Sequence, residues 1–287
     1  MNKSILFVLF CMMVSAATAA TESKPATAHT IKANNDVYKA LPFSDKQDFK
    51  DAQRGFLFKP ETLTIKSDAG NVVWDMEQYK KYITLNKAAP DTVNPSLWRN
   101  SQLVMLHGLF EVTKNIYQVR SYDLSNITFV KGKTGWIVFD PLISPETAKA
   151  AYDLISEQLG KRPIVGIVYS HSHIDHYGGA TGLASKADVD AGKVQILAHE
   201  HFTEHAVSEN VIAGNAMGRR AIYMYGALLP RNERGSVNGG LGMTVSTGMA
   251  GLLLPSKEIK NTDEVVTIDG VKMVFQMTPG TEAPAEM

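Results

Sequence analysis

Apolar and polar positions between residues 96 and 287 follow strand and helix periods in turn, which predicts a mixed α/β domain. Short runs rich in β-branched and aromatic residues, some with clear alternation, predict strands. These runs are residues 109–119, 127–130, 136–139, 164–169, 194–198, 265–268 and 272–277. Asp269-Gly270 separates the last two runs, and two glycines lie within residues 131–135, so both places predict hairpin turns.

Helical spacing occurs before and between these runs. Ser144-Pro145-Glu146 offers a cap, a proline at the first helical position and an early acid, which predicts a helix over residues 145–159. Helices are also expected at residues 45–53, 71–85 and 199–210. Hairpins followed by alternating strands and helices indicate a sheet covered by helices. Within residues 215–257, helical text with methionine and tyrosine gives way to the glycine-rich stretch 234–251. This stretch is too long for an ordinary connection, as in a functional lid or a disordered loop.

The first twenty residues form a separate segment. Lys3 is followed by the apolar run 5–14 and by the small-residue sequence Ala17-Thr18-Ala19, an order that predicts a secretory signal peptide over residues 1–20. The apolar run is too short to cross a bilayer, so no stable membrane anchor is expected. The sequence therefore predicts a periplasmic or secreted protein, with an N-terminal extension over residues 21–95 and a catalytic domain over residues 96–287.

Composition narrows the chemistry. Lys plus Arg and Asp plus Glu number 29 each, so the net charge is zero and no nucleic-acid partner is expected. The only cysteine, Cys11, lies within the predicted signal peptide. The mature chain would then have neither a disulfide nor a thiolate ligand, so any metal must be held by histidine and carboxylate side chains.

The sequence His171-Ser-His173-Ile-Asp175-His176 follows directly on the apolar strand run 164–169. Residues two apart in an extended chain point the same way, so His171 and His173 can bind one metal ion, while Asp175 and His176 face a second position. Imidazole with carboxylate suits zinc, and also iron or manganese. Two such ions can share and activate a water molecule, and Asp175 would be the catalytic residue that orients it.

A chance cluster or a structural zinc site could also explain residues 171–176, but structural zinc sites are usually cysteine-rich.

The other histidines and the methionines have simpler interpretations. His201, Glu204 and His205 match the H-x-x-E-H pattern of zinc peptidases, and we interpret them as surface or supporting residues. His29 and His107 are isolated and are expected to be structural or solvent-facing. Core packing is the preferred role for the methionines, with a pocket lining as the alternative. These are Met217, Met224, Met243 and Met249.

The order strand, His-x-His-x-Asp-His, Gly-Gly, helix resembles the metallo-β-lactamase superfamily. Within it the chain is similar to the exported alkyl sulfatases, the zinc-dependent type III family. The segments that carry this resemblance are SLWRNSQLVMLHGLFEV (96–112), VYSHSHIDHYGG (168–179), RRAIYMYGALLPRNERGSVNGGLG (219–242) and TPGTEAPAEM (278–287). The resemblance implies an αββα sandwich, two zinc ions (Zn2+) and hydrolysis of linear primary alkyl sulfates, such as dodecyl sulfate, to alcohol and sulfate.

The same resemblance assigns ligands by position. His171 and His173 would bind one zinc ion, Asp175 and His176 the other, and Glu282 would be a further ligand; the bond cleaved would be carbon to oxygen. Substrate-binding residues stay unknown. We expect the full-length protein to be a homodimer and residues 96–287 to be a domain incomplete at its C-terminus. The alternatives are another hydrolase of this fold, acting on a lactam, lactone or thioester, or an inactive truncated product.

Overall fold

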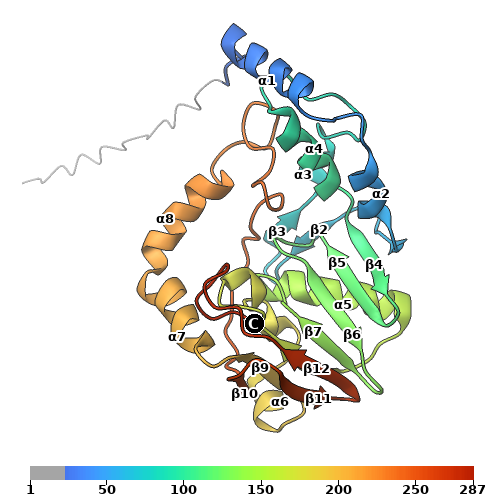
Figure 1. Cartoon of the computed structure of the whole chain (residues 1–287), viewed down its shortest axis with the longest axis vertical. Helices are drawn as coiled ribbons and strands as arrows, with labels where there is room; N and C mark the ends of the chain where they lie inside the picture. Colours follow the sequence, from blue (N-terminus) through green and yellow to red (C-terminus); the bar gives the residue numbers. More distant parts are fainter. Residues whose placement is uncertain (1–22) are drawn as a thin grey trace, which may run out of the picture.

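The computed structural model describes residues 23–287, and an eight-stranded sheet is its central element (Figure 1). The predicted signal peptide and Cys11 lie outside the described residues. The strands are β1 (Phe56–Phe58), β2 (Thr64–Lys66), β3 (Val72–Asp75), β4 (Gly108–Thr113), β5 (Ile116–Arg120), β6 (Ile127–Lys131), β7 (Trp136–Phe139), β8 (Ile164–Val168), β9 (Gln195–His199), β10 (Lys257–Ile259), β11 (Glu264–Ile268) and β12 (Val271–Phe275).

The sheet changes from antiparallel to parallel along its width. Its order is β1-β4-β5-β6-β7-β8-β9-β10, with antiparallel pairs from β1 to β7 and parallel pairs from β7 to β10. The predicted strand over residues 109–119 is in fact two strands, because Asn115 adopts a positive φ of 67° and turns the chain back. In the parallel half, the carboxyl ends of β7, β8 and β9 lie at one edge, where ligands bind in open α/β sheets.

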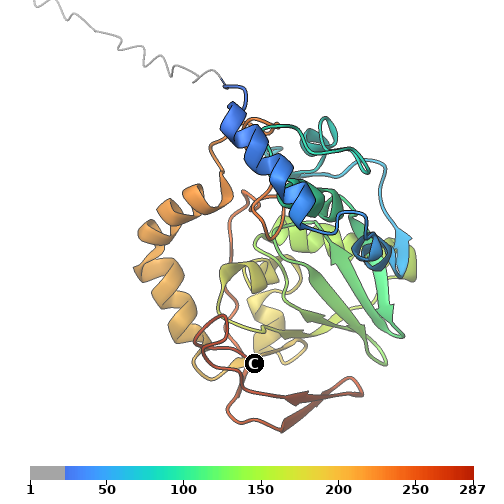
Figure 2. The ribbon, with the colours of Figure 1, turned by 45° about the horizontal axis from the view of Figure 1, so that its top comes forward.

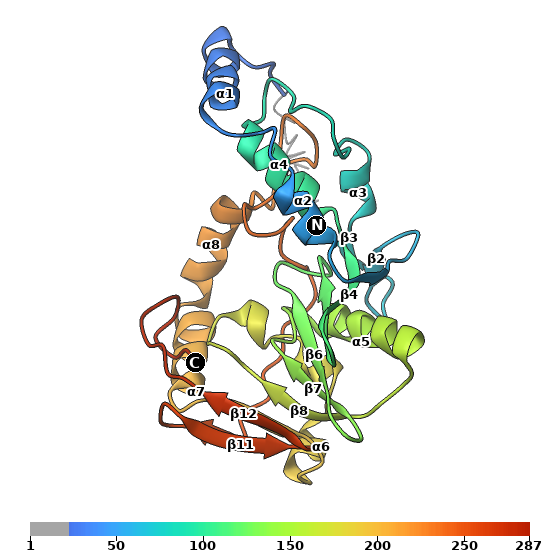
Figure 3. The ribbon, with the colours of Figure 1, turned by 45° about the vertical axis from the view of Figure 1, so that its right-hand side comes forward.

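Helices cover one face of the sheet and the edges beside it. They are α1 (Ala28–Ala40), α2 (Gln47–Gln53), α3 (Glu77–Lys80), α4 (Pro95–Val104), α5 (Pro145–Leu159), α6 (Lys186–Asp190), α7 (Phe202–Val207) and α8 (Gly214–Tyr225), with 3-10 turns η1 (Ile174–His176) and η2 (Ala180–Gly182) and a π-helix η3 (Ser208–Ile212). Helix α5 begins and ends as predicted: the Ser144 side chain accepts a hydrogen bond from the Thr147 N–H, and Gly160 follows with φ 88°. Figure 3 shows α5 lying along the sheet.

A hairpin covers the opposite face. Strands β11 and β12 pack Val266, Ile268 and further apolar side chains against the sheet. Figure 2 shows this hairpin in dark red beneath the rest of the chain. Its turn is as predicted, with φ 46° at Asp269 and 81° at Gly270, as a type I′ turn requires. The Asp269 carboxylate also accepts hydrogen bonds from the N–H groups of Thr134 and Gly135 (2.7 and 2.8 Å), which fixes the hairpin to the β6–β7 turn. The chain therefore has a helical layer, a sheet and a second β layer.

The N-terminal part differs from its prediction. Residues 71–85 form β3 and then the short helix α3 instead of one helix, because the run Val72–Asp75 pairs with β2. Strand β1 joins the main sheet beside β4, and Trp74 and Tyr79 belong to the same buried core as the later strands. The division at residue 95 stays a prediction, but packing is continuous across it.

Helices α7 and α8 stand beside the sheet as an arm, seen in orange in Figures 1 and 2. Helix α8 has no fully buried residue. Beyond it, residues 226–256 contain neither helix nor strand and run back past the N-terminal region, where the Tyr82 hydroxyl donates to the Ser236 carbonyl (3.0 Å). The predicted helix 199–210 is shifted: β9 continues to His199, α7 begins at Phe202, and the π-helix η3 follows it directly to Ile212. Among the described residues, no helix is long and apolar enough to cross a membrane.

Candidate metal centre

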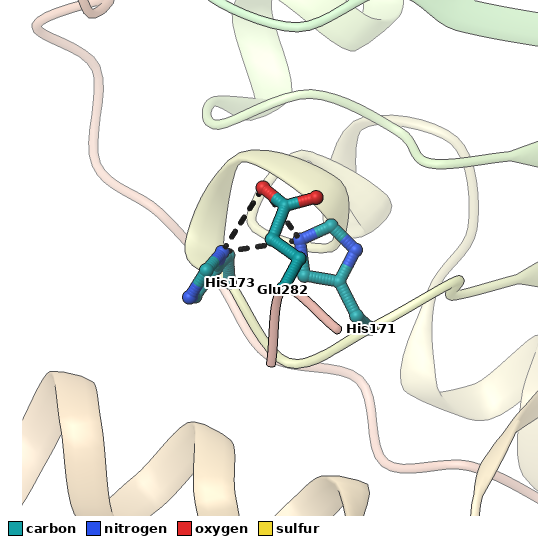
Figure 4. Close-up of side chains that lie close together, drawn as sticks. All are labelled: His171, His173 and Glu282. Carbon is teal, nitrogen blue, oxygen red and sulfur yellow. Dashed lines mark hydrogen bonds and ion pairs between the residues drawn. The ribbon is translucent and has the colours of Figure 1, made fainter. Parts of the chain in front are cut away.

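The chain between β8 and η1 presents two histidines to a common point (Figure 4). His171 is 3 % exposed, and its Nε2 lies 3.1 Å from Nδ1 of His173. Strand β8 is buried between β7 and β9, so its carboxyl end is held on both sides. Gly179 allows the following turn to pack closely, since a Cβ there would lie 2.0 Å from the Pro141 carbonyl oxygen. The rim that carries the histidines is therefore rigidly supported.

Glu282 joins these histidines from the far end of the chain. Its Oε1 lies 3.8 Å from His171 Nε2 and 3.7 Å from His173 Nδ1. These three residues form a group whose possible ligand atoms all lie within 4.8 Å of one another. The structure thus brings together three of the five predicted ligands, including the one separated by over a hundred positions in sequence.

Asp140 fixes the orientation of His171, and sequence reasoning missed it. The Asp140 carboxylate accepts hydrogen bonds from the Ser170 N–H and the Ser170 hydroxyl, both at 2.8 Å. Since the Ser170 hydroxyl proton is used there, its oxygen accepts from Nδ1–H of His171 at 2.9 Å, and Nε2 is left with a free lone pair. The signal was available in the sequence, because Asp140 directly follows the neighbouring parallel strand β7.

Asp175 and His176 form a pair of their own beside the three-residue group. His176 Nε2 lies 3.2 Å from Asp175 Oδ2, and Nδ1 lies 3.0 Å from Asp140 Oδ2, a short contact that is not aligned as a hydrogen bond. Burial opposes a charge on His176, but the two carboxylates outweigh it and raise its pKa to about 10. Burial raises the pKa of Asp175, but the contact with His176 outweighs burial and keeps this pKa below its usual value. Their role as ligands to a second metal ion stays a prediction.

The three-residue group suits a zinc ion. Two nitrogens bound to tetrahedral zinc at about 2.0–2.1 Å lie about 3.3 Å apart, close to the 3.1 Å between His171 Nε2 and His173 Nδ1. Burial and the nearby His176 lower the pKa of His171, which favours the neutral imidazole that binds metals. The donor set is two imidazoles and a carboxylate, which leaves a fourth position open, as in catalytic zinc sites.

A cavity of about 480 Å³ opens directly beside this group. His173, Asp175 and Glu282 line one end of it, and most of the remaining wall is apolar. Its further lining residues are Leu124, Ile143, Ile174, Glu209, Asn210, Gly214, Met217, Gly218, Arg220, Ala221, Met224, Tyr225, Leu241 and Val245. The methionines therefore divide: Met217 and Met224 face the cavity, Met243 is buried in the core as expected, and Met249 is 85 % exposed.

The second histidine group does not assemble a site. His201 is the N-cap residue of α7 and is exposed, and it forms no group of possible metal ligands with Glu204 and His205 among the described residues. Its nearest carboxylates, Glu200 and Glu204, are 3.9 and 3.8 Å away. Within residues 23–287 the only group of three or more possible metal ligands is that of His171, His173 and Glu282. The surface interpretation of this motif is confirmed for His201 and Glu204.

The two isolated histidines lie apart from the centre. His29 is exposed on α1, and His107 is buried and directly precedes β4 in the chain. Neither ring nitrogen of His107 has a hydrogen-bond partner among the described residues. Their expected structural or solvent-facing positions are therefore confirmed.

Comparison with known families identifies the fold class. Residues 121–258 match the family model of the metallo-beta-lactamase superfamily. Together with the sheet, the hairpin layer and the histidine rim, this match shows that this part of the chain has the metallo-β-lactamase fold. The predicted fold class is thereby confirmed.

Individual proteins similar to this chain are more specific than the family model. The chain is 52 % identical over 286 residues to a linear primary-alkylsulfatase from Pseudomonas sp, covering 100 % of this chain and 42 % of the relative. It is 47 % identical over 272 residues to an (R)-specific secondary-alkylsulfatase from Pseudomonas sp, covering 94 % and 41 %. The structure of the inverting sec-alkylsulfatase Pisa1 from Pseudomonas sp. matches with a TM-score of 0.88 at 48 % identity, over 92 % of this chain and 42 % of that one. The chain thus resembles alkylsulfatases and spans less than half their length.

Proposed function

We propose that this chain is the metal-binding part of a zinc-dependent hydrolase that cleaves linear primary alkyl sulfates to alcohol and sulfate. The observation that carries the proposal is that His171, His173 and Glu282 form one group, and that two of them, His173 and Glu282, line a largely apolar cavity. Similarity to primary and secondary alkylsulfatases supports sulfate esters as the substrate class. Identity to the primary enzyme is higher, which favours linear primary esters.

The cavity suits an amphiphilic ester. Its wall of leucine, isoleucine and methionine side chains can bury an alkyl chain, at about 0.8 kcal/mol per buried CH₂ group. The ligand end is different, because Asp175, Glu209 and Glu282 line it and Arg220 is the only lysine or arginine among the described lining residues. An anionic sulfate would be repelled there unless cations offset the carboxylates. The charges of the cavity therefore favour a metal-dependent reaction.

Each residue has a proposed role in this reaction. His171, His173 and Glu282 would hold a zinc ion, with Asp175 and His176 as ligands to a second one. Zinc would supply Lewis acidity and the activation of a water molecule. Asp175, which is partly buried and kept ionised by its contact with His176, would accept the proton of that water and orient it. The Asp140–Ser170 pair keeps the His171 lone pair directed at the metal position.

Release of inorganic sulfate from dodecyl sulfate tests the activity. We expect turnover by the chain, loss of it on chelation and recovery with zinc, and no turnover by His173→Ala. His201→Ala is the matched control and should keep full activity. Water labelled with ¹⁸O should place the label in the alcohol if the carbon–oxygen bond breaks. Activity retained in His173→Ala, or turnover of nitrocefin or an acyl thioester in preference to alkyl sulfates, would contradict the proposal.

Location and assembly are also proposals. The predicted signal peptide supports export to the periplasm or the medium, which N-terminal sequencing of protein from each cell fraction would test. Mature protein starting at residue 20 or 21 is expected. A homodimer is proposed for the full-length protein, and a monomeric mass in solution would rule it out.

A further inference from the structure

The loop that carries Glu282 is closed and anchored by a second glutamate, Glu286. The backbone of Glu286 forms a bridge with His171, and the N–H of the following Met287 donates to the Ser170 carbonyl at 3.0 Å. At the other end of the loop, Thr278 N–H donates to the Glu286 carbonyl at 3.0 Å. Glu286 therefore sits at the base of the loop, directly beside the strand end that bears the histidines.

The Glu286 side chain reaches back into this loop. Its Oε2 accepts hydrogen bonds from the N–H of Glu282 at 2.8 Å, from the N–H of Ala283 at 3.1 Å and from the Thr281 hydroxyl. Hydrogen bonds to an ionised acceptor are stronger than those between neutral groups. One carboxylate oxygen thus holds the backbone on both sides of the Glu282 Cα.

Glu282 itself has little else to fix it. Its side chain is 61 % exposed, and its contacts with His171 and His173 are 3.7–3.8 Å long. The neighbouring Ala283 and Ala285 are buried and anchor the loop, but they do not set the direction of the Glu282 side chain. The position of this carboxylate therefore depends on the backbone conformation that Glu286 imposes.

We propose that Glu286 is a positioning residue that fixes Glu282 against His171 and His173 and so sets the metal affinity of the centre. This inference rests on metal binding by those three residues and not on the identity of the substrate. Without the Glu286 carboxylate, the loop must be ordered when the metal binds, and the entropy of that ordering weakens binding. Loss of a supporting hydrogen bond around a metal ligand typically lowers affinity by about 10–100-fold.

The test is zinc affinity of the whole chain, measured by competition with a chromogenic chelator. Glu286→Ala should weaken zinc binding by about 10–100-fold. Glu286→Gln keeps an oxygen that can accept from the same three donors, so it should restore most of the affinity. Thr281→Val removes one donor and should lower the affinity less than Glu286→Ala. Absorption of bound cobalt(II) gives a second readout, and only Glu286→Ala should change the ligand-field bands strongly.

Glu264→Ala is the matched control. That carboxylate also accepts from a backbone N–H, that of Lys260 at 3.0 Å, but it supports the β10–β11 connection instead of the ligand loop. Its variant should bind zinc like the unmodified chain. Thermal unfolding of the metal-free proteins checks the fold, and Glu286→Ala should unfold close to the parent temperature.

Defined results would overturn the inference. These are unchanged zinc affinity in Glu286→Ala, equal losses in Glu286→Ala and Glu264→Ala, and the absence of zinc binding by the parent chain. Should Glu286→Ala fail to fold, Thr281→Val decides, and wild-type affinity in that variant rejects the role. Failure of dodecyl sulfate turnover, with the zinc result as expected, would reject the proposed substrate and leave the role of Glu286 standing.

Discussion

Two histidine groups in this chain match metal-binding sequence patterns, yet their structural settings are opposite. His171 is almost completely buried, lies at the end of an interior strand, and meets a carboxylate from a distant segment. His201 is exposed at the start of α7, and within the described residues the carboxylates less than 4 Å from it, Glu200 and Glu204, belong to its own short segment. Both patterns supply suitable ligand types, but only in the first group do ligands from separate segments of the chain meet at one point.

The difference teaches that the backbone beneath a motif decides whether its side chains can share one ion. A strand end clamped between two neighbours fixes His171 and His173 to within a narrow range of positions. The exposed start of α7 gives His201 no carboxylate from a distant segment within 4 Å among the described residues. Supporting hydrogen bonds reinforce this contrast, because Asp140 and Ser170 orient the His171 ring.

The largest expected effect comes from removing one member of the first group. His173→Ala should lower zinc affinity by about 100-fold or more, because it removes a ligand as well as the geometry of the set. Isothermal titration of the metal-free chain with zinc would measure this.

His201→Ala is the corresponding change in the second group and should leave zinc affinity unchanged. Equal losses in the two variants would break the comparison, because they would place both groups in one functional centre.

A third histidine, His107, sharpens the comparison by showing that burial alone makes no site. Burial, and then the positive charges of Lys80 and Lys59 against the opposing charge of Glu77, lower its pKa to about 4. The His107 imidazole takes up a proton near pH 6.5 in the unfolded chain, but only near pH 4 in the folded protein. The neutral buried imidazole therefore costs no stability above pH 6.5, and the folded state loses stability as the pH falls from 6.5 toward 4. The loss attributable to His107 amounts to about 3 kcal/mol at most.

His107→Leu should remove that part of the pH dependence. Urea unfolding of both proteins at several pH values between 4 and 7 gives the free energy of unfolding of each. As the pH falls, the free energy of unfolding should decrease less for the variant than for the parent protein. Parallel curves would show that His107 is not the group that titrates.

A smaller effect is expected for Asp140→Asn, which keeps the shape of the side chain and weakens its hold on Ser170 and His176. Zinc affinity should fall by about 10–100-fold, equivalent to about 1.4–2.7 kcal/mol. Asp269→Asn alters a carboxylate with similar hydrogen bonds at the β6–β7 turn, away from the metal centre. That control should leave zinc binding unaltered, and a matching loss there would mean that general loosening of the sheet explains both results.

Much of the fold could be predicted because its signals are local. The α5 helix carries its own cap and stop residues, and the β11–β12 turn carries Asp269-Gly270, so both elements lie where the sequence places them. Predictions failed where pairing partners decided the structure. Residues 71–85 have near-helical spacing, but β2 recruits Val72–Asp75 as a strand, and apolar alternation over residues 109–119 hides the turn at Asn115.

The sequence by itself determined the histidine rim, because a strand followed by His-x-His places two side chains on one side through local geometry alone. Family resemblance added Glu282. Only the tertiary structure decided that Asp140 orients His171 through Ser170, that Glu286 holds the Glu282 loop, and that α8 supplies one wall of the cavity. Asp140 meets Ser170 across 30 positions, and the Glu282 loop reaches the histidines because the Glu286 backbone bridges to His171. These contacts depend on packing, which no local period or spacing records.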